Sequence, residues 1–273
     1  MANLNGQMWE WATLSEVLGG KVAIVTGAAG GIGKAVCDAL SARGAAIAAV
    51  DADSAAVAEQ VSTCSSDSRT IIGITADITD PLQVNTMVRK VKGELGRIDI
   101  LVNVAGILRT GPILSYSLED WSAVLAVNTT GVFLVSQAVG STMVSQRSGS
   151  IITVASNAGM VPRVHMAAYG ASKAASILLT KCFGLELSPY GIRCNIVSPG
   201  STDTSMLRSM WTDEHGASKT ISGSLDDFKL GIPLAKLAEP VDVAGAVVFL
   251  ASDDSSHITM HNICVDGGAT LGC

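Results

Sequence analysis

Charged and aromatic residues are scarce in this chain of 273 residues. Asp, Glu, Lys and Arg make up 15% of the sequence and Phe, Trp and Tyr 4%, whereas 48% of the residues are hydrophobic. Disordered chains have the opposite composition, so disorder is excluded and a well-filled core is expected. Basic residues are in the minority, with 18 Lys and Arg against 24 Asp and Glu. Because nucleic-acid phosphates bind basic patches, no nucleic-acid partner is expected.

Other signals are missing as well. The longest uncharged apolar runs are expected to be stretches such as 44–50 and 243–251, which are shorter than the roughly 20 residues that cross a bilayer, so no membrane partner is expected. Residues 1–20 contain no Lys or Arg, which a secretion signal would need. The six cysteines include no CxxC pair, a pattern typical of reduced thiols. We therefore expect a cytoplasmic protein.

Short apolar runs rich in β-branched residues alternate with segments of helical periodicity. The predicted strands are 22–26, 46–50, 70–75, 98–102, 150–155, 193–198 and 262–265. The predicted helices are 31–43, 54–66, 81–95, 118–146, 167–188 and 240–251. Apolar strands separated by helices pair in parallel, buried on both faces, through right-handed crossovers. The expected fold is an α/β, Rossmann-type, doubly wound parallel sheet of about seven strands, in one domain over 21–273 after an N-terminal extension at 1–20.

Two stretches do not follow this alternation. Residues 1–20, with Trp9 and Trp11, form either a frayed tail or a packing arm. The polar segment 203–230 follows the carboxyl end of a strand, where a substrate lid is commonly placed. An ordered surface insertion without a gating role is the alternative for this segment.

A glycine-rich motif, TGAAGGIG at 26–33, follows the first predicted strand and opens a helix. Gly27 suits a tight turn, while Gly31 and Gly33 allow phosphate and helix to approach closely. A pyrophosphate would then lie at the helix N-terminus, where free N–H groups and the helix dipole favour negative charge. Because the motif stands in a strand–turn–helix context, dinucleotide binding is favoured over an ordinary turn.

Asp51 ends the second predicted strand, 18 residues after Gly33. This position suits a carboxylate that accepts hydrogen bonds from the ribose hydroxyls and repels a 2′-phosphate. Ala28, Ala29 and Gly30 in the glycine motif and Ala52 after Asp51 offer no basic group to hold such a phosphate, so the expected cofactor is NAD rather than NADP. The alternative role for Asp51 is to cap the helix that begins near Ser54.

Tyr169 and Lys173 stand four residues apart in YGASK, so both leave one face of the same helix. A free tyrosine, with a pKa of about 10, is a poor base at neutral pH, but a nearby cation favours its phenolate. Ser156 follows the fifth predicted strand, at the edge where such sheets bind ligands. Tyr-x-x-x-Lys alone is common by chance; with the glycine motif and Ser156 it predicts a dehydrogenase site.

Further motifs accompany these residues: Asp77 in ADI, NVAG at 103–106, VNTTG around Asn128, and SPG at 198–200. With them, the chain resembles the short-chain dehydrogenase/reductase family from residue 21 to its end. The resemblance implies a tetrad in which Asn128 holds a water, Ser156 orients the reacting oxygen, Tyr169 transfers its proton and Lys173 binds the nicotinamide ribose. The family more often has NNAG than NVAG, which puts one adenine-side contact in doubt.

The same resemblance implies a set of cofactor contacts. They are Gly27, Gly31, Ile32, Gly33, Asp51, Asp77, Ile78, Asn103, Ala105, Gly106, Tyr169, Lys173, Pro199, Gly200, Thr202 and Thr204. It also implies a homo-tetramer built on the helices 118–146 and 167–188.

Longer strings, such as 161–175, 194–204, 228–238 and 257–272, resemble one branch of the family. The branch oxidises cyclohexadiene diol acids with NAD to 2,3-dihydroxybenzoate in catechol siderophore synthesis, so an acidic diol is the expected small-molecule substrate. Its carboxylate needs a cation, and Arg109 and Arg163 are the candidates, because a guanidinium pairs with a carboxylate through two hydrogen bonds. For each, a solvated surface arginine is the alternative.

Three other interpretations stay open at this stage. The substrate could be another alicyclic alcohol or an amino-substituted dihydro acid, or the chain could bind nucleotide without turnover. His257 and His261 have the spacing of two metal ligands, but no third ligand accompanies them, so no metal is expected. His165, together with the Met and Trp residues near the motifs, reads as packing or pocket wall.

Overall fold

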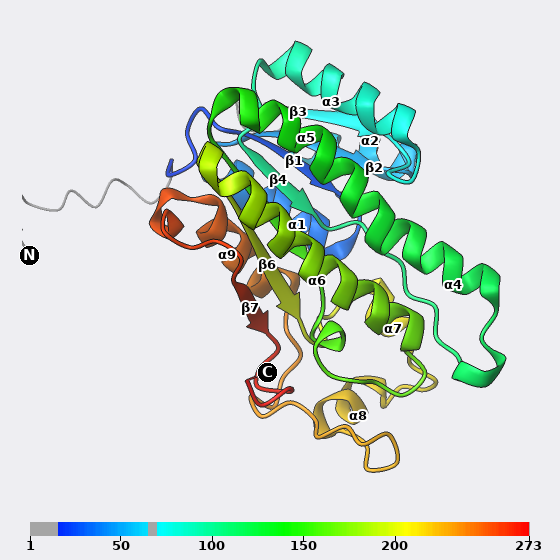
Figure 1. The fold of residues 1–273 in the computed structure, drawn as a ribbon. Helices are drawn as coiled ribbons and strands as arrows, with labels where there is room; N and C mark the ends of the chain where they lie inside the picture. The colour runs from blue at the N-terminus through cyan, green and yellow to red at the C-terminus, as the bar shows by residue number, and fades with distance from the viewer. Residues whose placement is uncertain (1–15, 65–69, 273) are drawn as a thin grey trace, which may run out of the picture.

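The computed structural model describes residues 16–64 and 70–272 and contains a seven-stranded sheet between two layers of helices (Figure 1). The sheet order is β3-β2-β1-β4-β5-β6-β7, with every neighbouring pair parallel. The strands are β1 (Val22–Thr26), β2 (Ala46–Asp51), β3 (Ile71–Thr75), β4 (Ile100–Asn103), β5 (Gly149–Val154), β6 (Ile192–Pro199) and β7 (Asn262–Val265). The predicted doubly wound fold is therefore confirmed.

Helices connect the strands in the predicted places. The longer ones are α1 (Gly31–Ser41), α2 (Ser54–Cys64), α3 (Pro81–Leu95), α4 (Leu118–Leu125), α5 (Val132–Gln146), α6 (Ala167–Leu187) and α9 (Pro240–Ala251). A π-helical turn, η2 (Ala126–Gly131), joins α4 to α5, so the predicted helix 118–146 is continuous but not uniform. The other predicted elements are found with ends that differ by two residues or fewer.

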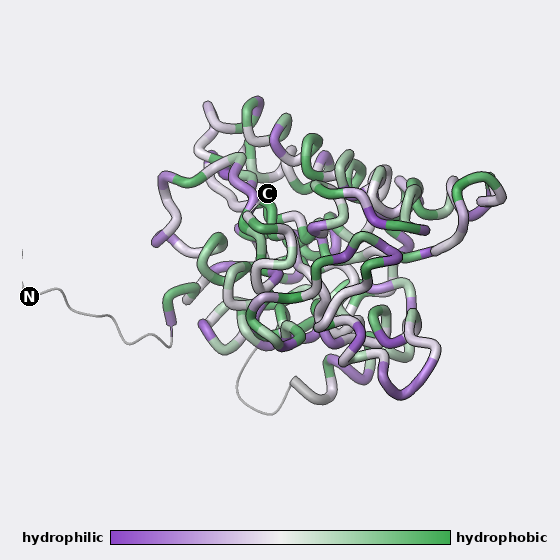
Figure 2. Tube along the Cα trace, turned by 90° about the horizontal axis from the view of Figure 1, so that it is seen from below, coloured by the Kyte–Doolittle hydropathy of each residue, from purple (hydrophilic) through white to green (hydrophobic). Residues whose placement is uncertain are grey.

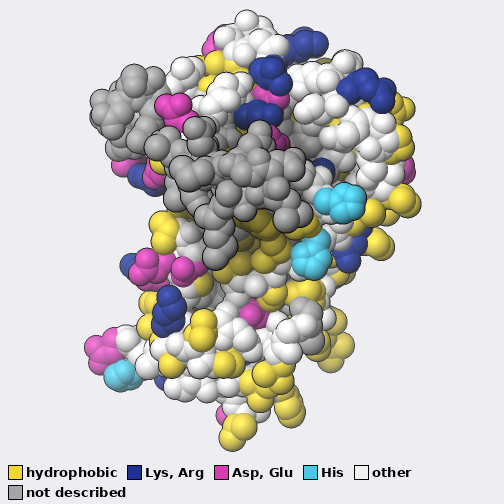
Figure 3. Space-filling view, turned by 90° about the vertical axis from the view of Figure 1, so that its left-hand side faces the viewer, with side chains coloured by type: hydrophobic (Ala, Val, Ile, Leu, Met, Phe, Trp, Pro, Cys, Tyr) yellow, Lys and Arg dark blue, Asp and Glu magenta, His cyan; other side chains and the backbone are white. Residues whose placement is uncertain are grey.

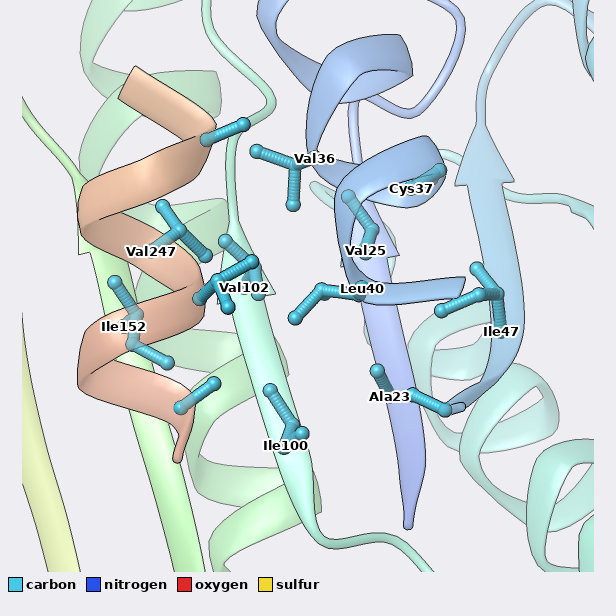
Figure 4. Packing of buried hydrophobic residues seen from close by; sticks show 14 of the residues in the cluster. Ala23, Val25, Val36, Cys37, Leu40, Ile47, Ile100, Val102, Ile152 and Val247 are labelled. Atoms are coloured by element: carbon cyan, nitrogen blue, oxygen red, sulfur yellow. The ribbon is translucent and has the colours of Figure 1, made fainter. Parts of the chain in front are cut away.

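Two apolar clusters cover the two faces of the sheet. On one face, α1 and α9 pack together over β1, β4 and β5. Figure 4 shows Leu40 of α1 and Val247 of α9 on either side of Val102, with all three fully buried. On the other face, α3, α5 and α6 cover the sheet. Strands covered on both faces need apolar residues at successive positions, which explains the runs without polar alternation.

The order of the strands reverses between β1 and β4, and this is where the site begins. The chain runs outward from β1 through β2 to β3, then returns to place β4 on the other side of β1. At their carboxyl ends, the Thr26 hydroxyl accepts hydrogen bonds from the backbone N–H groups of Val104 at 3.2 Å and Ala105 at 3.4 Å. Open α/β sheets bind ligands at such a reversal.

One expectation about apolar segments needs correction. The sequence contains an uncharged run longer than those considered above, and the continuous helix Leu118–Gln146 has a window of mean hydropathy 1.5, long and apolar enough by composition to cross a membrane. In the structure, 44% of that window is buried, and the helix packs on β4 and β5 beside α3 and α6. Contact on two sides explains why it has so few charges.

Residues 16–20 pack against the domain. Leu18 is fully buried in the cluster beneath α1, and its backbone N–H donates to the Arg43 carbonyl oxygen at 2.9 Å. Leu18 of the predicted extension therefore belongs to the core, whereas its neighbours 16, 17, 19 and 20 are exposed and Trp9 and Trp11 lie outside the described residues.

The segment 203–230 lies beyond the carboxyl ends of the strands. It contains two short helices, α7 (Ser205–Arg208) and α8 (Gly216–Ser222), and an antiparallel bridge between Ser224 and Lys229. Figure 1 places α7 and α8 below the sheet, and Figure 2 views the molecule from that side. The segment is thus folded and lies over the edge at which the candidate site residues gather.

Candidate active site

A groove with a volume of about 400 Å³ runs along the carboxyl ends of β1, β2 and β4. The glycine motif forms its floor. Gly27 has a left-handed backbone (φ 67°), and a Cβ on Gly33 would lie 1.9 Å from the Gly27 carbonyl oxygen, so a side chain at Gly33 would force the turn apart. Helix α1 begins at Gly31 without a side-chain cap, which leaves N–H groups of its first turn available to phosphate oxygens.

Two carboxylates line the far end of this groove. Asp51 accepts hydrogen bonds from the backbone N–H groups of Ala29 at 3.1 Å and Asp53 at 3.3 Å. Asp53, not Asp51, caps α2, because its Oδ1 accepts from Ala55 and Ala56. The capping alternative for Asp51 is therefore removed. Asp77 and Ile78 lie beside it, and the described lining contains no Lys or Arg.

The remaining predicted cofactor residues fall into two groups. Ile32, Ala105, Gly106 and Thr204 line the groove, and Pro199, Gly200 and Thr202 line the cavity that continues from it. Asn103 lines neither; it is buried behind them, and its Nδ2 donates to Ser136 Oγ at 3.0 Å. Asn103 thus supports the end of β4 rather than the groove surface.

The YGASK residues meet Ser156 at the end of β5. Lys173 Nζ donates to the Val154 carbonyl oxygen at 3.0 Å and lies 5.7 Å from the Tyr169 ring centroid. Ser156 caps a short 3₁₀ turn, η3 (Asn157–Gly159), and its Oγ accepts from the Ala158 N–H at 3.1 Å. The structure therefore brings three of the four predicted catalytic side chains to one wall of the same cavity.

Burial shifts the pKa values of two side chains on this wall, Tyr169 and Lys173. Burial raises the pKa of Tyr169, while a hydrogen bond from the Ser156 side chain acts in the opposite direction by favouring the phenolate. Burial also lowers the pKa of Lys173 to about 8, because its ammonium is removed from water without a carboxylate partner. Lys173 is therefore a cation at neutral pH that an anionic or hydroxyl-bearing ligand would stabilise.

Asn128 sits in the π-helical turn η2, fully buried. Its Oδ1 accepts from the Ile107 N–H at 2.8 Å, and its Nδ2 donates to the Ile107 carbonyl oxygen at 2.9 Å and to Ser172 Oγ at 3.0 Å. A Cβ on Gly106 would lie 3.2 Å from Asn128 Oδ1 and 3.3 Å from Lys173 Nζ. The π turn thus places Asn128 beside Lys173, and such turns often mark functional sites.

The cavity in front of Tyr169 has a volume of about 550 Å³ and shares Ile32, Gly106 and Thr204 with the groove. The segment 203–230 supplies part of its wall, including Met206, Trp211 and Lys229. A ring bound there would have Tyr169 and Ser156 on one side and this segment on another. The predicted position of the segment over the site is therefore observed, whereas its motion as a lid stays a prediction.

The two candidate arginines differ in their surroundings. Arg163 is half-buried and lines the cavity. Arg109 is more than half exposed, its Nε lies 3.6 Å from Asp120 Oδ1, and it is not among the lining residues, although its neighbours Leu108 and Thr110 are. Arg109 therefore has an ion-pair partner outside the cavity, and Arg163 is the one of the two that lines the cavity.

Sequence reasoning missed Lys229 and Asp227, which also line the cavity. Lys229 lies in one of the strings that carried the branch resemblance, but no local pattern shows that residue 229 folds back toward residue 163. His165 lines the cavity too. Within the part of the chain that the structure describes, no three His, Cys, Asp or Glu side chains are grouped to hold a metal ion.

Comparisons with known proteins agree with this geometry. The family model described as short chain dehydrogenase matches residues 21–215. A 2,3-dihydro-2,3-dihydroxybenzoate dehydrogenase from Bacillus subtilis (strain 168) is 55% identical to the chain, with 93% of this chain and 97% of the relative covered. A vibriobactin-specific 2,3-dihydro-2,3-dihydroxybenzoate dehydrogenase from Vibrio cholerae serotype O1 is 43% identical, over 91% and 95%. The crystal structure of levodione reductase superposes with a TM-score of 0.87 at 29% identity, over 93% and 99%.

Proposed function

We propose that this chain, which belongs to the short chain dehydrogenase family, oxidises 2,3-dihydro-2,3-dihydroxybenzoate to 2,3-dihydroxybenzoate with NAD. The observation that carries the proposal is a single cavity that joins Ser156, Tyr169 and Lys173 to an unpaired arginine, Arg163. The first three are the groups that an alcohol dehydrogenation needs, and the arginine suits the carboxylate of an acidic diol. The similarity to dihydroxybenzoate dehydrogenases over nearly the whole chain supports this substrate.

Each wall residue has one task in the reaction. Once substrate is bound, Ser156 donates its single hydroxyl hydrogen to the reacting oxygen instead of to Tyr169, and so orients the substrate. Tyr169, as phenolate, takes the hydroxyl proton as the carbinol C–H bond breaks. Lys173 supplies the positive charge that favours the phenolate, and Asn128 fixes the backbone at Ile107 beside it. NAD, when bound, accepts the hydride.

The chemistry of the ring makes the oxidation effectively one-way. Loss of a hydride and a proton from one carbinol leaves a ring ketone next to the second carbinol carbon. That carbon then gives up its hydrogen as a proton while the ketone oxygen gains one, and the tautomer is an aromatic catechol. Aromatisation therefore removes the ketone that the reverse reaction would need.

NAD rather than NADP is proposed because of the groove's charge. Asp51 and Asp77 line it, and no described lining residue is basic. A 2′-phosphate in this position would approach two carboxylates without a cation to offset them. The glycine floor and the uncapped start of α1 suit the pyrophosphate that both cofactors share. We also propose that the enzyme acts in the cytoplasm, because the proposed reaction consumes NAD.

A homo-tetramer is also proposed. Helix α6 leaves Leu178 and Leu185 more than 60% exposed, and α5 leaves Phe133 partly exposed beside Phe183. Exposed apolar side chains on long neighbouring helices suit contact with a second copy. Further apolar side chains are exposed on the face that carries α9 and the chain end (Figure 3). Light scattering tests this proposal: a monomer at micromolar concentration would contradict it.

The experiment for the function is a comparison of substrates. Purified protein is given NAD or NADP with the diol acid, with the same cyclohexadiene diol lacking its carboxylate, and with cyclohexanol. We expect rapid reduction of NAD with the diol acid and a much lower kcat/KM with each of the others. Turnover restricted to neutral alcohols would keep the dehydrogenase and remove the acidic diol as substrate.

A further inference from the structure

We infer that Lys229, together with Arg163, binds the carboxylate of the substrate and makes the enzyme select acidic over neutral diols. This inference rests on the proposed function and adds a specificity residue to it. Both side chains line the cavity that contains Tyr169. Arg163 comes from the loop before α6, six residues ahead of Tyr169, and Lys229 from the segment 203–230, so the two cations approach from separate parts of the chain.

Neither cation has an anionic partner among the described residues. Other cations do: Arg208 pairs with Asp203 at 2.7 Å and Lys219 with Asp213 at 2.5 Å, whereas no ion pair within 4.0 Å involves Arg163 or Lys229. Both are half-buried, where an unpaired charge costs more than on an open surface. An anion that binds between two such cations in one cavity would therefore stabilise both of them.

The charge balance of the cavity points the same way. Its lining includes Arg163, Lys173 and Lys229 but only one carboxylate, Asp227, although the chain as a whole carries a net charge of −6. Lys229 is close enough to feel its neighbours: burial and the positive charge of Arg163 both lower its pKa, and Asp227 partly offsets this. A bound carboxylate would relieve the repulsion between the two cations.

The backbone holds Lys229 in place. Its N–H donates to the Ser224 carbonyl oxygen and its carbonyl oxygen accepts from the Ser224 N–H, both at 2.8 Å. A Cβ on Gly223 would lie 2.3 Å from the Lys229 carbonyl oxygen, and Gly223 has φ 84°, so the turn needs glycine there. These two hydrogen bonds close the hairpin 224–229, so the backbone from which the Lys229 side chain extends toward the cavity has a fixed position.

Arg163 and Lys229 are not equivalent. Arg163 also lines a neighbouring cavity of about 570 Å³, with Phe228 and Leu271, whereas Lys229 lines the cavity with Tyr169 and not this neighbour. Arg163 has a planar guanidinium that can pair with both oxygens of a carboxylate, whereas the Lys229 ammonium is a compact single charge. We therefore assign the bidentate contact with the carboxylate to Arg163. Arg163 and Lys229 together select charged over neutral ligands.

The test uses Lys229→Met with Lys219→Met as its matched control, because Lys219 is an exposed lysine of the same segment that already pairs with Asp213. We expect Lys229→Met to raise KM for the diol acid by about 10- to 100-fold with a smaller change in kcat, the loss typical of one charge-assisted hydrogen bond. The ratio of kcat/KM for the acid to that for the neutral diol should fall with it. Lys219→Met should keep the wild-type ratio.

Binding of product gives a second readout that needs no turnover. Titration calorimetry in the presence of NADH compares 2,3-dihydroxybenzoate with catechol, which lacks the carboxylate. We expect Lys229→Met to lose most of the preference for the acid and Lys229→Arg to recover part of it, with unchanged unfolding midpoints. An unchanged preference in Lys229→Met would overturn the inference, even if the wild type oxidises the diol acid. Failure of the wild type to oxidise that acid, with the preference for bound acid intact, would instead reject the proposed function.

Discussion

Lys173 Nζ lies 5.7 Å from the centre of the Tyr169 ring, over its face, while the same ammonium donates to the Val154 carbonyl oxygen. The four-residue spacing puts both side chains on one face of α6, and β5 supplies the acceptor. Lys173 is thereby held as a buried cation next to a buried phenol.

Replacing Tyr169 with Phe should lower kcat for the diol acid by about 10²- to 10⁴-fold, the usual contribution of a general acid–base group. The hydroxyl is the only group removed, so the unfolding midpoint should change little. Tyr190→Phe is the matched control, because Tyr190 is partly exposed in the turn after α6 and does not line the cavity. Steady-state rates check the pair. Full turnover by Tyr169→Phe would show that another group takes the proton.

Oxidation should become faster as pH rises, until Tyr169 is ionised. Burial raises the pKa of Tyr169, whereas the hydrogen bond from Ser156 lowers it by favouring the phenolate. Ser156→Ala removes the hydrogen bond that lowers the pKa of Tyr169, so kcat/KM should begin to rise at a higher pH. Its absolute value should also be lower at every pH. The pH profiles of wild type and Ser156→Ala measure this shift. Profiles with the same midpoint would mean that Ser156 does not act on Tyr169.

Lys173 should leave a signature in stability as well as in activity. Its folded pKa of about 8 lies below the free value of 10.5, so the protonated form is disfavoured by folding. Below pH 8 the fold carries the full cost of the buried ammonium, and as pH rises from 8 toward 10.5 this cost disappears. In the apo-protein, the unfolding free energy of the wild type should therefore increase relative to that of Lys173→Met as pH rises across this range. Denaturant titrations at pH 7 to 10 measure it, and parallel pH dependences would contradict the buried cation.

Asp51→Ala should reduce the preference for NAD over NADP by about tenfold or more, because the groove loses the carboxylate that we expect beside the ribose 2′ position. Asp53→Ala is the control, since Asp53 is exposed and its carboxylate caps α2 instead. Asp53→Ala should lower stability slightly and leave the cofactor ratio unchanged. Equal NAD-to-NADP ratios in wild type and Asp51→Ala would contradict the assigned role.

The regular elements were predictable because the physics that forms them is local. Strands buried on both faces must be apolar at successive positions, as in Val22–Thr26, and α3 begins at Asp80 and Pro81, a capping pair that can be read directly from the sequence. The family resemblance is confirmed, and several of its motifs lie at the ends of β1, β4, β5 and β6. The predicted catalytic side chains meet because those ends share one edge of the sheet.

What could not be predicted depends on contacts between distant segments. The π-helical turn that carries Asn128 has no separate periodicity in the sequence, and it is accompanied by side-chain contacts to Ile107 and Ser172. Arg109 looked equivalent to Arg163 until the structure placed Asp120 beside it. Lys229 reaches the cavity only because the segment 203–230 folds back beneath the sheet. Each of these depends on tertiary packing, which a single sequence does not reveal.

The most direct test of the account is the stoichiometry of a complete reaction. Purified protein is mixed with NAD and a limiting amount of 2,3-dihydro-2,3-dihydroxybenzoate, and reduced cofactor and aromatic product are both quantified by chromatography. We predict one NADH for each 2,3-dihydroxybenzoate formed, with no product from Tyr169→Phe on the same time scale. Reduced cofactor without a catechol, or no reduction at all by protein that binds NAD, would contradict it.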